Sequence, residues 1–167
     1  MPAENIKFGI VISIYNTGKY LEACIFSLQK QKYSNFVVVA VDDASTDNSV
    51  EVFKRVSRGD SRFILIENQH NRGVSHARNL ALEELSRLNV DYVAFIDSDD
   101  FVTPSYLKNY VEVLQKTPVD HLICGNKFLS RKGFEREIYS TNIRLMNQEE
   151  NFWQFFNWDH WHTHTET

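Results

Sequence analysis

Three carboxylates stand within four residues at Asp97-Ser98-Asp99-Asp100, directly after the short apolar run of residues 92–96. These acids repel one another, so a bound cation would stabilise the cluster. Carboxylate oxygens are hard ligands that suit Mg²⁺ or Mn²⁺, and such an ion can bridge a protein to a diphosphate. The alternative is a solvated acidic turn ahead of a helix, because acid-rich turns between strands and helices are common.

Two further acids, Asp42 and Asp43, follow the apolar run of residues 36–41. A buried charge without a partner would be costly at this position. A carboxylate in this place can accept the imide or amide hydrogen of a pyrimidine base, or the hydroxyl hydrogens of a ribose. We therefore expect ligand contact for Asp42. For Asp43 and Asp47 the residue types favour helix capping instead.

Residues 71–79 combine Gly73, which permits a tight turn, with Arg78, which lies one turn into the helix that follows. Arginine can pair with phosphate oxygens or with the acidic cluster, although a solvated arginine on an amphipathic helix is the usual case. Tyr15 and Asn16 come directly after the first apolar run. An aromatic ring there can stack on a base, and packing at the rim of the sheet is the alternative.

These polar groups all follow predicted strands. Short apolar runs rich in β-branched residues predict strands at 8–14, 36–41, 63–66, 92–96 and 122–124. Apolar positions at helical spacing predict helices between them, over 19–31, around 52–56, over 74–88, and from Pro104 through 114. Such alternation predicts a mostly parallel sheet with helices on both faces, and a ligand site at the carboxyl ends of the strands.

The alternation of predicted strands and helices ends at Asn126. Residues 131–133 predict a turn between Phe128 and the segment 138–139, which would form an antiparallel excursion. Further on, Asn147 and Glu150 resemble the capping box at the start of a last helix that carries several aromatic residues.

Composition excludes several classes of protein. The formal net charge is −4, from 18 basic and 22 acidic residues that are mixed along the chain, so no basic stripe is present for a nucleic acid. Only two cysteines occur, Cys24 and Cys124, each in an apolar run, which favours reduced core residues and a cytoplasmic setting. We expect no signal peptide, and no window approaches the ~20 apolar residues that cross a bilayer.

The order and spacing of four segments resemble the family 2 inverting glycosyltransferases of the GT-A fold. The segments are residues 12–16, 41–47, 71–79 and 95–100, followed by Pro104. The resemblance spans residues 6 to about 114. It implies a Rossmann-like α/β fold in three layers, with a nucleotide-sugar-binding core over residues 1–125. Residues 126–167 would then begin an acceptor-side region within the same domain.

The resemblance also implies roles for individual residues. In that family the residues at Ser13, Tyr15 and Asp42 cradle the nucleotide base. The acid at Asp97 binds the ribose, and the acid at Asp99 holds Mn²⁺ or Mg²⁺ on the β-phosphate.

Arg78 matches the family's arginine near the base and phosphate end of the site. Ala44 stands where many relatives have glycine, and we expect that substitution to cost little. The implied reaction is direct displacement at the anomeric carbon with inversion, in which a carboxylate base takes the acceptor proton. Relatives supply this base after the antiparallel excursion and continue further, so we expect a fragment in which Asp159 is only a stand-in for the base.

The implied partners are a nucleoside-diphosphate sugar, UDP-linked by resemblance, and a saccharide or lipid-linked acceptor. Bacterial relatives commonly build cell-surface polysaccharides, which implies a cytoplasmic protein at the inner face of the membrane. A peripheral membrane contact and a homodimer are left open.

Three other interpretations remain. A phosphoacceptor receiver domain also places acids after its strands, but Lys127 then follows the wrong strand and residues 8–16 have no counterpart. A haloacid-dehalogenase-like phosphatase would carry Thr or Val two residues after its DxD motif, where this chain has Phe101. A nucleotide-sugar-binding fragment without turnover is the third alternative.

Overall fold

The structure is a computed structural model that describes residues 6–119, 126–129 and 135–138. The chain divides into two compact units, residues 1–120 and 121–167, which are treated separately below. The elements of the first unit are β1 (Phe8–Ile14), α1 (Gly18–Gln29), β2 (Phe36–Asp42), α2 (Ser49–Val56), β3 (Phe63–Glu67), α3 (Val74–Arg87), β4 (Tyr92–Phe95) and α4 (Tyr106–Lys116).

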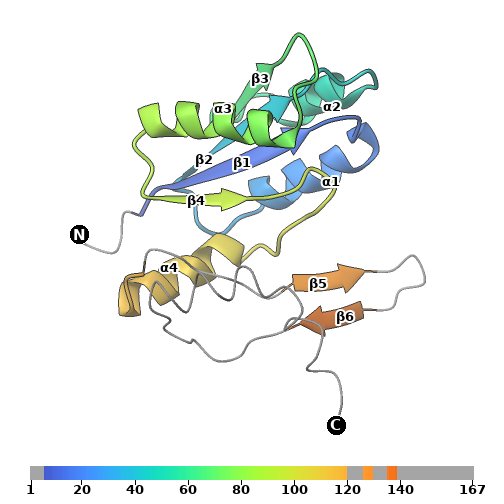
Figure 1. Cartoon of the computed structure of the whole chain (residues 1–167). Helices are drawn as coiled ribbons and strands as arrows, with labels where there is room; N and C mark the ends of the chain where they lie inside the picture. The colour runs from blue at the N-terminus through green and yellow to red at the C-terminus, as the bar shows by residue number, and fades with distance from the viewer. Residues whose placement is uncertain (1–5, 120–125, 130–134, 139–167) are drawn as a thin grey trace, which may run out of the picture. The chain divides into compact units, whose positions relative to one another are not determined.

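The first unit is built on a parallel sheet whose described strands follow the order β3-β2-β1-β4. β2 lies in its interior, and all seven of its residues are buried. A continuous apolar run is what a strand covered on both faces requires, because each face of the sheet packs against helices. The predicted alternating α/β architecture is therefore confirmed (Figure 1).

One face of the sheet is covered by α3. Its buried residues Ala77, Ala81 and Leu85 form a core cluster with Val11 of β1 and with alternate residues of β2. The Leu85 side chain packs closely over Gly9, where an added Cβ would stand 2.7 Å from Leu85 Cδ2. Figure 1 shows α1 and α2 on the opposite side of the sheet from α3.

Helix boundaries differ slightly from those predicted. α1 ends at Gln29 rather than Gln31, since the buried Gln31 side chain links this end of α1 to the start of α4: its Nε2 donates to Thr103 O at 2.7 Å and its Oε1 accepts from Leu107 N at 3.0 Å. α4 begins at Tyr106, so Pro104 precedes the helix instead of occupying its first turn.

The second unit contains a two-stranded sheet. β5 (Asn126–Leu129) pairs antiparallel with β6 (Glu135–Ile138), and Asn126 stands opposite Ile138. This confirms the predicted antiparallel excursion. The strand predicted at 122–124 and the helix predicted after Asn147 lie outside the described residues. Within the part of the chain that the structure describes, none of the helices has both the length and the apolar character needed to cross a membrane.

Candidate functional site

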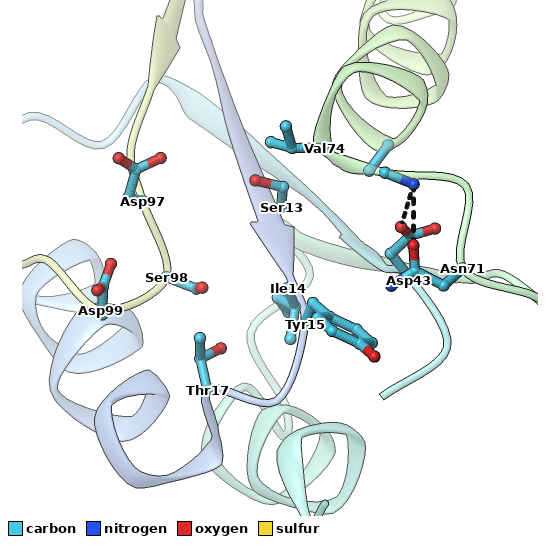
Figure 2. Close-up of a pocket in the computed structure, with 12 residues that line it drawn as sticks. Ser13, Ile14, Tyr15, Thr17, Asp43, Asn71, Val74, Asp97, Ser98 and Asp99 are labelled. Carbon is cyan, nitrogen blue, oxygen red and sulfur yellow. Dashed lines mark hydrogen bonds between the residues drawn. The ribbon is translucent and has the colours of Figure 1, made fainter. Parts of the chain in front are cut away.

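A pocket of about 290 Å³ opens at the carboxyl ends of the strands in the first unit. Ser13, Tyr15 and Thr17 line it from the end of β1, and Asp43 lines it from the end of β2. The first turn of α3 and the segment after β4 complete its wall. Figure 2 shows these side chains around the pocket.

The register of the sheet explains why these groups meet. Val11 of β1 stands opposite Val39 of β2 and Phe95 of β4. Successive side chains of a strand alternate between the two faces of the sheet. A residue that follows Val11, Val39 or Phe95 by an even number of positions therefore lies on the same face, which α3 covers. Ser13, Asp43 and Asp97 are such residues. Three separate strands thus bring polar groups to one pocket, at the point where α3 begins.

This alternation places the neighbouring acids Asp42 and Asp43 on different faces of the sheet. Asp42, expected as a base contact, is not among the residues that line the pocket, whereas its neighbour Asp43 is. The Asp42 side chain takes the opposite face, where its Oδ2 accepts a hydrogen bond from Ser45 N at 3.0 Å. Its Oδ1 is buried and has no hydrogen-bond partner among the described residues. Asp43, not Asp42, continues the series of Val39 and Val41 on the face that α3 covers.

The carboxylate of Asp43 fixes the turn that leads into α3. It accepts hydrogen bonds from Asn68 Nδ2 at 2.8 Å, from Arg72 N at 3.0 Å and from Gly73 N at 2.7 Å. Gly73 has φ = 88°, a conformation that favours glycine. Burial by itself would raise the pKa of Asp43, but these hydrogen bonds outweigh it and hold the pKa below its ordinary value.

The acidic segment after β4 forms the opposite wall. Asp97 and Asp99 both line the pocket, and the intervening Ser98 is 4% exposed. Burial raises the pKa of the neighbouring Asp100, and the negative charges of Asp99 and Asp97 raise it further. Asp100 therefore feels the repulsion of the two acids that line the pocket.

Arg78 pairs with this acidic segment rather than lining the pocket. Its Nη2 lies 3.0 Å from Asp97 Oδ1, and its guanidinium carbon lies 5.7 Å from the centroid of the Phe95 ring. Because both charged side chains are substantially exposed, the pair contributes little to stability. The contact places the Arg78 guanidinium beside the Asp97 carboxylate at the pocket wall.

The remaining residues of interest are Tyr15, Thr17 and Asp159. Tyr15 is 49% exposed and lies in the pocket wall as expected of an aromatic ring that can stack on a ligand. Thr17 also lines the pocket, although nothing in its residue type had singled it out. Asp159, the predicted stand-in for a general base, lies outside the described residues.

The acidic wall fits a divalent cation that takes some of its ligands from the protein and the others from a bound molecule. Within the described residues, no group of three or more His, Cys, Asp or Glu side chains is placed to hold a metal ion. Mg²⁺, however, is usually bound through one or two carboxylates together with substrate phosphates. Asp99 can supply such a carboxylate from one wall of the pocket.

Comparison with known protein families gives one clear result. The family model described as glycosyl transferase family 2 matches residues 9–165. Glycosyltransferase GlyA of Streptococcus pneumoniae is 40% identical over 125 residues, which cover 73% of this chain and 17% of GlyA. The chain thus spans less than a fifth of that relative.

Solved structures agree. The S. aureus TarS fragment 1-349 in complex with UDP-GlcNAc matches with a TM-score of 0.61 and 30% identity, over 66% of this chain and 32% of that one. The mannosyltransferase PcManGT of Pyrobaculum calidifontis, in complex with GDP-Man and Mn²⁺, matches with a TM-score of 0.59 and 26% identity, over 68% and 34% of the two chains. The matched part of the chain therefore shares its fold with two proteins whose structures are described as complexes with nucleotide sugars.

Proposed function

Since the chain belongs to glycosyl transferase family 2, we propose that it binds a UDP-linked sugar and transfers the sugar to a hydroxyl acceptor with inversion at the anomeric carbon. The observation that carries this proposal is the convergence of Ser13, Asp43 and Asp97 on one pocket at the strand ends. Family membership decides against the receiver domain and the phosphatase.

The base of the nucleotide binds at the end of the pocket formed by Tyr15, Asp43 and Asn71. The ring of Tyr15 offers a stacking surface. Asp43 is held ionised by its hydrogen bonds, so it can accept the imide hydrogen of a uracil ring. Asp43 thus takes the role that the sequence had suggested for Asp42.

The ribose and diphosphate bind toward the acidic wall. Asp97, oriented by Arg78, accepts hydrogen bonds from the ribose hydroxyls. Asp99 is the protein ligand of Mn²⁺ or Mg²⁺. When bound, this cation would stabilise the negative charge that develops on the departing diphosphate.

The transfer step also needs an acceptor hydroxyl and a general base. Inversion requires a carboxylate that takes the proton from the acceptor hydroxyl as the bond to the diphosphate breaks. Within this chain, Asp159 is the residue that we predict as this base. A saccharide or lipid-linked acceptor, and a role in cell-surface polysaccharide synthesis at the inner face of the membrane, rest on the family resemblance.

Calorimetric titration of the chain with UDP tests the proposal. We expect saturable binding of UDP that is tighter in Mn²⁺ than in EDTA, because the cation offsets repulsion between the diphosphate and the acidic wall. Ser57→Ala, which alters a hydroxyl at the end of α2, is the control and should bind as the wild type does. No binding of UDP in either condition would refute the proposal.

A further inference from the structure

Asn16 joins the two loops that carry the base end of the pocket, although its own side chain is not among those that line it. Its backbone N–H donates to Ser45 Oγ at 3.0 Å. Its side-chain Oδ1 accepts from Thr46 N at 2.8 Å and from Asp47 N at 3.3 Å. The loop after β1 is thereby tied to the loop after β2.

The link closes into a ring of hydrogen bonds. Asp47, which Asn16 holds through its backbone N–H, uses its carboxylate to accept from Gly18 N at 3.0 Å and from Ser49 N at 2.9 Å. These are the first residues of α1 and α2. The backbone around Asn16 is therefore fixed on both sides, directly at its own amide and again two residues later at Gly18.

Asn16 also adopts a conformation that few residues tolerate. Its φ is 53°, in the left-handed region that asparagine enters more readily than other residues with a Cβ atom. The chain turns sharply here, directly after Tyr15. No hydrogen bond from the described residues holds the Tyr15 side chain, which is half exposed, so the backbone turn at Asn16 decides where its ring lies.

We propose that Asn16 is a positioning residue for the donor nucleotide: its turn and its bonds to the loop after β2 hold Tyr15 in place opposite Asp43. This inference rests on the proposed function and adds to it a residue that touches no substrate. Since Asn16 is exposed, it contributes little core packing, and its loss should weaken donor binding much more than it weakens the fold.

Three substitutions separate the two properties of Asn16. Asn16→Asp keeps an acceptor oxygen and a left-handed turn, Asn16→Gly keeps only the turn, and Asn16→Ala keeps neither. Asn89 provides the matched control, because it also has a positive φ, 50°, and lies two residues beyond the end of α3, whereas the pocket is lined by the start of that helix. Asn89→Ala therefore carries a similar backbone penalty.

The measurement is calorimetric titration with UDP in Mn²⁺, with thermal unfolding of each variant alongside. We expect about tenfold weaker binding for Asn16→Ala, an intermediate loss for Asn16→Gly, and rescue to within about threefold for Asn16→Asp. Asn89→Ala should lose a similar amount of thermal stability to Asn16→Ala and bind UDP like the wild type.

Amide hydrogen exchange gives a second readout. Thr46 and Asp47 should lose protection in Asn16→Ala and keep it in Asn16→Asp. If Asn16→Ala binds UDP as tightly as Asn89→Ala does, the positioning role is wrong while the proposed function stands. If the wild-type chain binds no UDP, the proposed function fails and the positioning role fails with it.

Discussion

The backbone amide of Gly73 donates a 2.7 Å hydrogen bond to the Asp43 carboxylate, which joins the end of β2 to the start of α3 (Figure 2). Through this bond Asp43, which lines the pocket, also fixes the start of α3, whose first turn lines the same pocket. Changes at Asp43 should therefore alter stability and donor binding together.

Asp43→Asn should lower the free energy of unfolding by about 2 kcal/mol, because an amide cannot accept from Arg72 N, Gly73 N and Asn68 at once. It should also weaken UDP binding by at least about tenfold. Urea unfolding and calorimetry measure the two effects. Asp42→Asn is the comparison, and it should bind UDP within about twofold of the wild type. Greater loss at Asp42 than at Asp43 would reverse our assignment of the two acids.

The same carboxylate predicts a pH dependence. The folded-state pKa of Asp43 lies below its ordinary value, so its contribution is present above the unfolded-state pKa of about 3.9 and is lost as the pH falls through the folded-state pKa. The difference in unfolding free energy between wild type and Asp43→Asn should therefore shrink below about pH 4. Urea unfolding at pH 7, 5 and 3 measures it. A difference that stays constant down to pH 3 would show that Asp43 does not stabilise the fold as a carboxylate.

Ala44→Gly should stabilise the chain. Ala44 has φ = 61°, where a Cβ atom costs about 1 kcal/mol, so the gain should be up to about that amount. The matched control is Ala23→Gly on the exposed side of α1, which should destabilise by about 1 kcal/mol. Thermal unfolding would show opposite signs for the two substitutions. Equal losses would mean that residue 44 is not strained.

Gly9→Ala should destabilise the fold by about 1–3 kcal/mol, because the new methyl group would stand 2.7 Å from Leu85 Cδ2 in the core. Leu85→Ala alone should cost about 2–5 kcal/mol through the cavity that it leaves. Since that cavity can accept the methyl group, the double variant should be less destabilised than the sum by at least about 1 kcal/mol. Additive losses in urea unfolding would contradict this close approach of β1 and α3.

The sequence predicted the strands well because each one is a short apolar run that ends at polar residues, as residues 36–41 end at Asp42. It favoured Asp42 over Asp43 as the ligand contact, although the alternation of side chains does not reveal which face of the sheet carries the pocket. Our proposal of Asp43 rests on the burial of Val39 and Val41 under α3, a tertiary contact that the sequence alone does not show.

Contacts between loops add to what the sequence predicts locally. Asp47 was expected to cap α2, and its carboxylate also accepts from Gly18 at the start of α1, because the two helices pack together. Ala44 was expected to cost little as a small residue, and its positive φ adds a backbone cost that residue size does not reveal. For Arg78 the sequence offered phosphate oxygens, the acidic cluster or solvent, and the structure shows a 3.0 Å contact with Asp97 of the acidic cluster.

A crystal structure of the chain with UDP and Mn²⁺ tests the central claim most directly. We predict the metal at Asp99, the ribose at Asp97, and the uracil ring against Tyr15 with its imide nitrogen about 3 Å from an Asp43 oxygen. UDP bound away from these strand ends, or a metal without contact to Asp99, would contradict the account.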